Sequence, residues 1–177
     1  MVIKKSKDIV GVHYLSRNIT QDKKGNRYLT YSWPSLFQVG IPDIFTEIYR
    51  KDMEREQEFH GLFYYPERSF LFRCTKGRAR LFLVDMRSDS KTFLRCVKPL
   101  LDGNGATQTY IPAGFAWGIL TLEENTSVQI HTTSGNGESP VMLDPFDSAL
   151  KLQWGDEEIL VATYDLPVQD AEYFKEV

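Results

Sequence analysis

The chain has 177 residues, of which 42% are hydrophobic and 13% aromatic, so it is too apolar to be disordered and we expect one domain over residues 1–177. Its formal net charge is −3 and its lysines and arginines are scattered, which argues against a nucleic-acid partner. No apolar run approaches the roughly 18 residues that span a bilayer, and the start lacks the apolar stretch of a signal peptide, so we expect a cytoplasmic protein without a membrane partner.

Short segments rich in Val, Ile, Phe, Tyr and Thr recur along the chain, separated by clusters of Gly, Asn, Asp and Pro. This pattern is typical of an antiparallel β-sandwich or barrel. After Trp154 the character changes, and Pro167 predicts the first turn of a short C-terminal helix. The predicted fold class is therefore all-β with one short helix. We expect strands at 9–15, 28–32, 44–49, 58–65, 69–75, 78–86, 92–97, 107–111, 116–122, 127–133 and 151–154.

Two connecting segments and the two cysteines have a distinct character. Residues 134–140 have the composition of an exposed loop, and the charged run 50–59 is typical of a solvated turn. Cys74 and Cys96 lie in apolar strand-like runs, where buried free thiols are the ordinary outcome.

The segment 110–119 is the most informative stretch, because Pro112 and Gly114 form a turn suited to a tight barrel corner. It resembles the corner of cupin-type double-stranded β-barrels, in which a histidine that faces the interior commonly follows. Trp117 stands in that place here.

Six segments taken in order, 59–65, 72–77, 84–93, 110–119, 143–145 and 152–154, resemble the dTDP-4-dehydrorhamnose 3,5-epimerase family. The resemblance implies a cupin-like jelly-roll barrel, a homodimer, a nucleotide-activated 4-keto-6-deoxy sugar as ligand, and a role in carbohydrate biosynthesis without a cofactor. In this family a histidine removes a proton next to the sugar ketone and a tyrosine returns one from the other face. Such chemistry needs a base of near-neutral pKa and a cation or hydrogen-bond donor for the enolate oxygen.

The resemblance also shows where this chain departs from the family pattern. Phe63 stands in place of the base histidine, Phe70 in place of a lysine that polarises the carbonyl, and Ile130 in place of the tyrosine. The carboxylate partner of the base is kept as Asp144. Phenylalanine and isoleucine cannot transfer protons, so the usual mechanism does not apply unchanged.

Replacement groups can be named from the same positions. His60 and His131 replace basic residues of the family and, with Tyr65 and Asp144, are the candidates for new acid–base chemistry. Both histidines could instead line a phosphate site or form ordinary hydrogen bonds. The candidate ligand-contacting residues are Glu47, Tyr49, Phe63, Phe70, Trp117 and, as a phosphate contact offered across a dimer, Lys24.

Two questions remain open at this point. The aromatic replacements either fill the former sugar site as core or leave an aromatic pocket for a ligand, and a filled or repurposed site is favoured over an open catalytic one. The chain is correspondingly either a diverged sugar-nucleotide epimerase or isomerase, or a non-catalytic barrel that binds a sugar nucleotide or acts as a scaffold. The three dispersed histidines predict no metal site.

Overall fold

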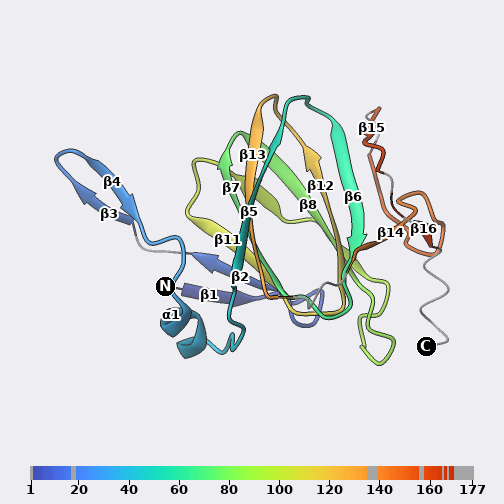
Figure 1. Cartoon of the computed structure of the whole chain (residues 1–177), viewed down its shortest axis with the longest axis horizontal. Coiled ribbons are helices and arrows are strands. Elements are labelled where there is room, and N and C mark those ends of the chain that lie inside the picture. Colours follow the sequence, from blue (N-terminus) through green and yellow to red (C-terminus); the bar gives the residue numbers. More distant parts are fainter. Residues whose placement is uncertain are drawn as a thin grey trace.

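Two β-sheets pack face to face around an apolar interior in the computed structural model (Figure 1). The structure describes residues 2–16, 19–134, 139–155, 158–164, 166 and 168–169. The first sheet has six strands in the order β1, β2, β11, β7, β13, β5, so that β5 is an edge strand. Its strands are β1 (Val2–Lys5), β2 (His13–Ser16), β5 (Glu47–Met53), β7 (Phe70–Lys76), β11 (Thr107–Ile111) and β13 (Thr126–Thr132).

The second sheet follows the order β10, β8, β12, β6, β14, β16, with β9 paired to β8 and β15 paired to β6. Among the described residues, all strand pairs are antiparallel except β14 with β16 and β15 with β6. Its strands are β6 (Glu58–Tyr64), β8 (Arg78–Asp85), β9 (Cys96–Val97), β10 (Leu100–Asp102), β12 (Phe115–Thr121), β14 (Val141–Leu143), β15 (Leu160–Val161) and β16 (Val168–Gln169).

The central strands are buried on both faces, which explains their almost continuous apolar sequence. On β12, Phe115, Trp117 and Ile119 point into the space between the sheets, whereas Ala116 and Leu120 belong to a second cluster on the outer face. The successive side chains of a strand alternate between its two faces, so each strand contributes to two cores at once.

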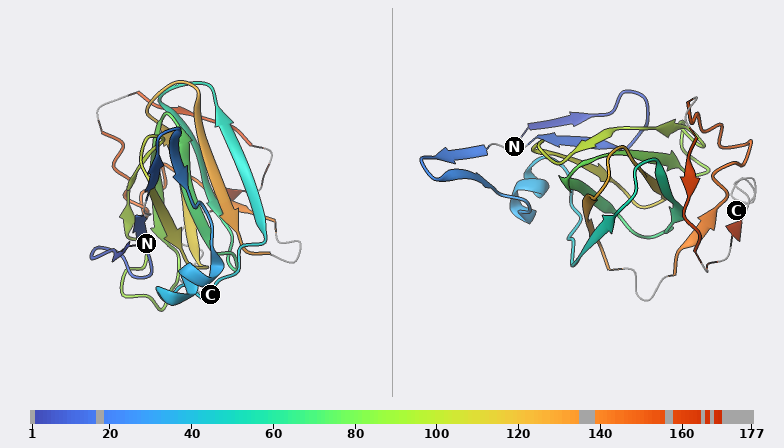
Figure 2. Two further views of the ribbon diagram at one scale, coloured as in Figure 1. Left: turned by 90° about the vertical axis from the view of Figure 1, so that its left-hand side faces the viewer. Right: turned by 90° about the horizontal axis from the view of Figure 1, so that it is seen from above.

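Different segments cover the two outer faces. Leu36 of helix α1 (Trp33–Gln38) packs with Leu71 and Tyr110 against the six-stranded sheet, and the segment around Leu150 and Trp154 covers the other sheet. A hairpin of β3 (Ile19–Asp22) and β4 (Gly25–Tyr28) extends from the barrel on the side opposite the C-terminal strands, as two views show (Figures 1 and 2).

A buried carboxylate stabilises the loop after β8. Asp85 is fully buried and accepts two side-chain hydrogen bonds from Arg87, both of 2.8 Å, and one each from Ser90 and Thr92, at 2.6 and 2.7 Å. Arg87 also donates to the carbonyl oxygen of Val10 at 2.6 Å. One carboxylate therefore holds together the end of β8, its exit loop and the N-terminal segment.

The all-β prediction is confirmed, and several local predictions need correction. A short C-terminal helix was expected from Pro167 onward, but Val168–Gln169 form a strand. Residues 165, 167 and 170–177 lie outside the described part of the chain. The expected strand at 151–154 is wrong because this segment has no regular structure and packs through Trp154. Helix α1 was not predicted, although Ser32 at its N-cap and Pro34 in its first turn are typical start signals.

The charged run 50–59 is not simply a solvated turn, because β5 continues to Met53 and β6 begins at Glu58. Cys74 and Cys96 are free thiols, the first buried and the second partly buried. Burial raises the pKa of both, that of Cys96 to about 11, so neither is a reactive thiolate near pH 7.

Candidate functional site

A cavity of about 480 Å³ opens into the barrel interior between the two sheets. Strands β5, β7 and β13 of one sheet and β6 and β12 of the other each contribute inward-facing side chains to its wall. Its lining residues are Tyr49, Lys51, Phe63, Tyr65, Arg68, Phe70, Trp117, Ile130 and Thr132.

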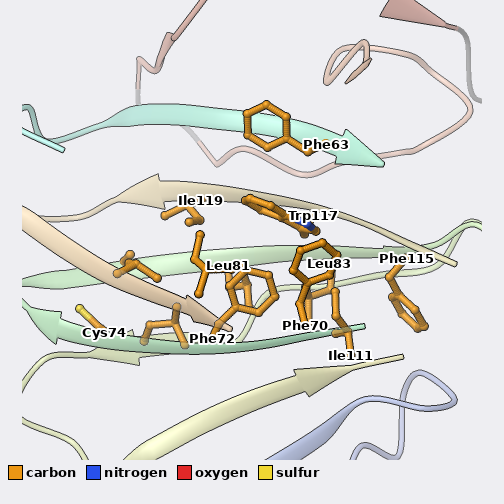
Figure 3. Close-up of a cluster of buried hydrophobic side chains, with 14 of the residues drawn as sticks. Phe63, Phe70, Phe72, Cys74, Leu81, Leu83, Ile111, Phe115, Trp117 and Ile119 are labelled. Carbon is orange, nitrogen blue, oxygen red and sulfur yellow. The ribbon is translucent and has the colours of Figure 1, made fainter. Parts of the chain in front are cut away.

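One wall of the cavity is aromatic. The Trp117 ring lies 5.0 Å from Phe63 and 5.5 Å from Phe70 between centroids, in tilted and edge-on arrangements (Figure 3). Phe63 is 7% exposed and Trp117 6%, so both rings are largely buried and still face the cavity. These aromatic rings belong to the core and also leave an open space beside them, which favours the aromatic pocket over a site filled by side chains.

The rim of the cavity carries polar and charged groups. Glu47 accepts a hydrogen bond of 2.9 Å from the Tyr49 hydroxyl and lies 3.4 Å from an Arg68 guanidinium nitrogen. The hydrogen bond to Glu47 raises the pKa of Tyr49, so the phenol remains protonated. The Arg68 guanidinium lies over the Tyr65 ring, 5.2 Å from its centroid. Glu47 therefore orients two lining residues without lining the cavity itself.

His60 lies behind this wall, close to two polar side chains. Its Nδ1 is 2.6 Å from the Tyr164 hydroxyl oxygen and its Nε2 is 3.3 Å from a Glu58 carboxylate oxygen. Lys51 donates a hydrogen bond of 3.0 Å to the same Tyr164 hydroxyl. Burial and the nearby Lys51 charge lower the pKa of His60, and Glu58 opposes this shift only in part. The imidazole is therefore neutral at pH 7.

The other predicted site residues are not brought to this cavity. His131 lies on the opposite face of β13 from Ile130 and Thr132, where its ring contacts Tyr31 and Phe45 at 5.5 and 6.4 Å.

Asp144 and Lys24 also lie elsewhere. The Asp144 side chain accepts the Phe146 amide hydrogen at 2.9 Å in a local turn. Lys24 is exposed on the turn of the projecting hairpin. Of the four predicted acid–base candidates, only Tyr65 lines the cavity, and His60 reaches it through Tyr164 and Lys51.

Four residues of the site were not predicted from the sequence: Lys51, Arg68 and Thr132 in the lining, and Tyr164 behind it. Strand alternation would have found two of them, because Lys51 follows Tyr49 and Thr132 follows Ile130 at a spacing of two. No sequence signal places Tyr164, which comes from the segment after β15.

A family model described as dTDP-4-dehydrorhamnose 3,5-epimerase matches residues 6–173. The chain belongs to this epimerase family. Two curated proteins with the name dTDP-4-dehydrorhamnose 3,5-epimerase match part of this chain. The Escherichia coli K12 protein is 35% identical over 91 residues, which cover 51% of this chain and 45% of that protein. The Sinorhizobium fredii protein is 33% identical over 85 residues, covering 48% and 44%. The matched segment thus spans less than half the length of these epimerases.

Solved structures of the same epimerase family share the fold over almost the whole chain. The Mycobacterium tuberculosis RmlC epimerase superimposes with a TM-score of 0.85 at 20% identity, covering 99% of this chain and 91% of the other. The Legionella pneumophila RmlC epimerase, solved in complex with dTDP-4-keto-L-rhamnose, gives 0.82 at 23% identity, covering 91% and 87%. The predicted family and its cupin-like barrel are confirmed.

Two further properties bear on the range of chemistry. Within the described ranges, no three His, Cys, Asp or Glu side chains gather in a way that could hold a metal ion. None of the helices in the described part of the chain is long and apolar enough to cross a membrane.

Proposed function

We propose that this protein binds a nucleotide-activated 4-keto-6-deoxy sugar and acts on it as a diverged epimerase or isomerase of carbohydrate biosynthesis, without a cofactor. The observation that carries the proposal is the open cavity, with an aromatic wall and two cationic side chains in its lining. Its volume of about 480 Å³ is in the range of small-molecule sites. The class of ligand suits the family, because one similar protein was solved with dTDP-4-keto-L-rhamnose and another with dTDP-quinovose.

The chemistry of the lining residues indicates which part of the ligand each of them would contact. Phe63, Phe70 and Trp117 offer flat apolar surface to the C–H face of a sugar or to a base. Tyr49 and Tyr65 offer hydroxyl groups to the ligand, and Lys51 and Arg68 offer positive charge to its phosphate or carbonyl oxygens.

The second candidate function is binding without turnover, and a specific observation favours it. Phe63 and Ile130 line the cavity where the family resemblance expects the base and the acid. Neither side chain can transfer a proton. A barrel that holds the sugar nucleotide as a binding module or scaffold would keep this lining and lose the reaction.

We expect the protein to bind dTDP-4-keto-6-deoxyglucose in isothermal titration calorimetry, because the cavity offers stacking surface and cations together. Solvent deuterium incorporated at C3 or C5, followed by NMR, then separates the two functions. Exchange above the buffer rate supports the epimerase or isomerase. Binding with exchange at the buffer rate supports the binding module, and absence of binding at millimolar ligand would rule out both. An active family epimerase serves as the positive control for exchange.

We also propose that the protein is a cytoplasmic homodimer. Strands β1 and β5 end the six-stranded sheet, and pairing of such edges between copies is a common route to closed dimers. The hairpin that carries Lys24 extends from the barrel, as a phosphate contact offered to a partner copy requires. An elution volume that corresponds to about 41 kDa, twice the chain mass of 20.5 kDa, is expected on size-exclusion chromatography with light scattering.

A further inference from the structure

Lys51 differs from the charged residues around it on β5. Arg50 and Asp52 are exposed and form an ion pair of 2.8 Å with each other. Lys51 lies between them, faces the opposite side of the strand and lines the cavity. Because side chains alternate along the edge strand β5, one cation of this charged run lies in the lining of the cavity.

The two cations of the lining are not equivalent. Arg68 lies within 3.4 Å of the Glu47 carboxylate, which compensates its charge. Lys51 instead donates to the neutral Tyr164 hydroxyl at 3.0 Å, and its ammonium lies 5.2 Å from the centroid of the Tyr164 ring. A cation held by a neutral hydroxyl and an aromatic ring keeps more of its attraction for an electron-rich oxygen than a cation paired with a carboxylate does.

A hydrogen-bonded chain fixes the partner of Lys51. The negative charge of Glu58 lies 3.3 Å from Nε2 of the neutral His60 without a hydrogen bond between them, and it favours the tautomer with the proton on Nε2, which leaves Nδ1 as an acceptor. The Tyr164 hydroxyl then donates to Nδ1 and turns its oxygen lone pairs toward Lys51. Tyr164 also packs against the cavity-lining Phe63, with ring centroids 5.0 Å apart. The tyrosine is thereby held on two sides.

We propose that Lys51 is the ligand-contacting cation of this cavity, that it binds an electron-rich oxygen of the nucleotide sugar, and that Tyr164 is the residue that positions its ammonium group. This inference rests on the proposed function. The oxygen belongs either to the sugar carbonyl, where Lys51 would stabilise the negative charge of an enolate, or to the diphosphate. Either source requires the same cation in the same place.

The test compares Lys51→Met with Arg50→Met in calorimetric titrations with dTDP and with dTDP-4-keto-6-deoxyglucose. Arg50 is the matched control because it is a cation of the same strand on the opposite face. We expect Lys51→Met to weaken binding of the keto sugar at least tenfold, and Arg50→Met to leave it within twofold. Loss for both ligands assigns the contact to the diphosphate, and loss for the keto sugar alone assigns it to the sugar.

The outcomes separate the inference from the proposed function. Wild-type-like binding by Lys51→Met would overturn the inference alone, and failure of the wild-type chain to bind either ligand would overturn both.

The variant Tyr164→Phe tests whether Tyr164 positions the ammonium group of Lys51. It should weaken binding of the keto sugar by about threefold and shift the Nδ1 resonance of His60 in nitrogen-detected NMR. An unchanged His60 resonance with unchanged affinity would remove Tyr164 from the proposal. Lys51→Arg should restore part of the affinity, since it keeps the charge.

Discussion

Asp85→Asn is expected to lower the free energy of unfolding by about 3–5 kcal/mol, the range found when one partner of a buried charged pair is removed. The fully buried carboxylate accepts hydrogen bonds from Arg87, Ser90 and Thr92. An amide offers one acceptor oxygen instead of two and leaves the Arg87 guanidinium without its counter-charge. Denaturant unfolding followed by tryptophan fluorescence measures the effect.

Asp89→Asn is the control for this experiment, because Asp89 lies exposed in the same loop. A surface change of this kind is expected to stay within about 0.5 kcal/mol of the wild type. If Asp85→Asn behaved like this control, the hydrogen-bonded carboxylate would not be the main support of the loop after β8.

The same carboxylate should give the protein a characteristic pH dependence. Burial alone would raise the pKa of Asp85, but the hydrogen bonds from Arg87, Ser90 and Thr92 outweigh it and lower the pKa. A carboxyl whose pKa is lower in the folded state stabilises the fold above its unfolded pKa, and this contribution is lost as pH falls through the folded pKa. The stability difference between wild type and Asp85→Asn should therefore shrink in that acidic window and stay constant from pH 5 to 7.

Gly118→Ala is expected to destabilise the fold by about 1–3 kcal/mol, as overpacking of a filled core does. A methyl group at Gly118 would overlap the ring of Phe59. That ring cannot move aside because it is fully buried and in edge-on contact with Phe82 and Trp154, at 5.3 and 4.8 Å. For a chain of this length the melting temperature should fall by roughly 2–4 °C per kcal/mol.

Phe59→Leu tests whether the clash is the cause. The smaller side chain makes room for the methyl group, so the double variant should lose less stability than the two single variants together. Additive losses would show that Gly118 matters for another reason.

The fold was predictable where sequence pattern and burial agree. Strand 107–111 matches β11, and the expected strand at 116–122 is displaced by one residue from β12. β12 is almost continuously apolar, and β11 is a short segment enclosed by turn residues on both sides, so the bounds of both left little choice. The edge strand β5 was cut short in the prediction, since its exposed face carries the charges that suggested a turn. Lys51 was lost from the candidate site for that reason.

The face of the strand on which each side chain lies was harder to predict than the position of the strand itself. His131 and Ile130 are neighbours on β13, and only the pairing of β13 with β5 and β7 decides which of them faces the cavity. Tyr164 depends on a long-range contact, the parallel pairing of β15 with β6, which brings the C-terminal segment beside His60. No local pattern contains that information.

The cavity wall and the main core are the same cluster of side chains. Phe63, Phe70, Trp117 and Ile130 face the open space and also pack with the buried interior residues of both sheets. A molecule that settles on this wall adds contacts to the cluster that must separate when the protein melts. Ligands that bind only the folded state raise its stability in proportion to RT ln(1 + [L]/Kd). A panel of nucleotide sugars can therefore be ranked by melting temperature alone, before any assay for turnover exists.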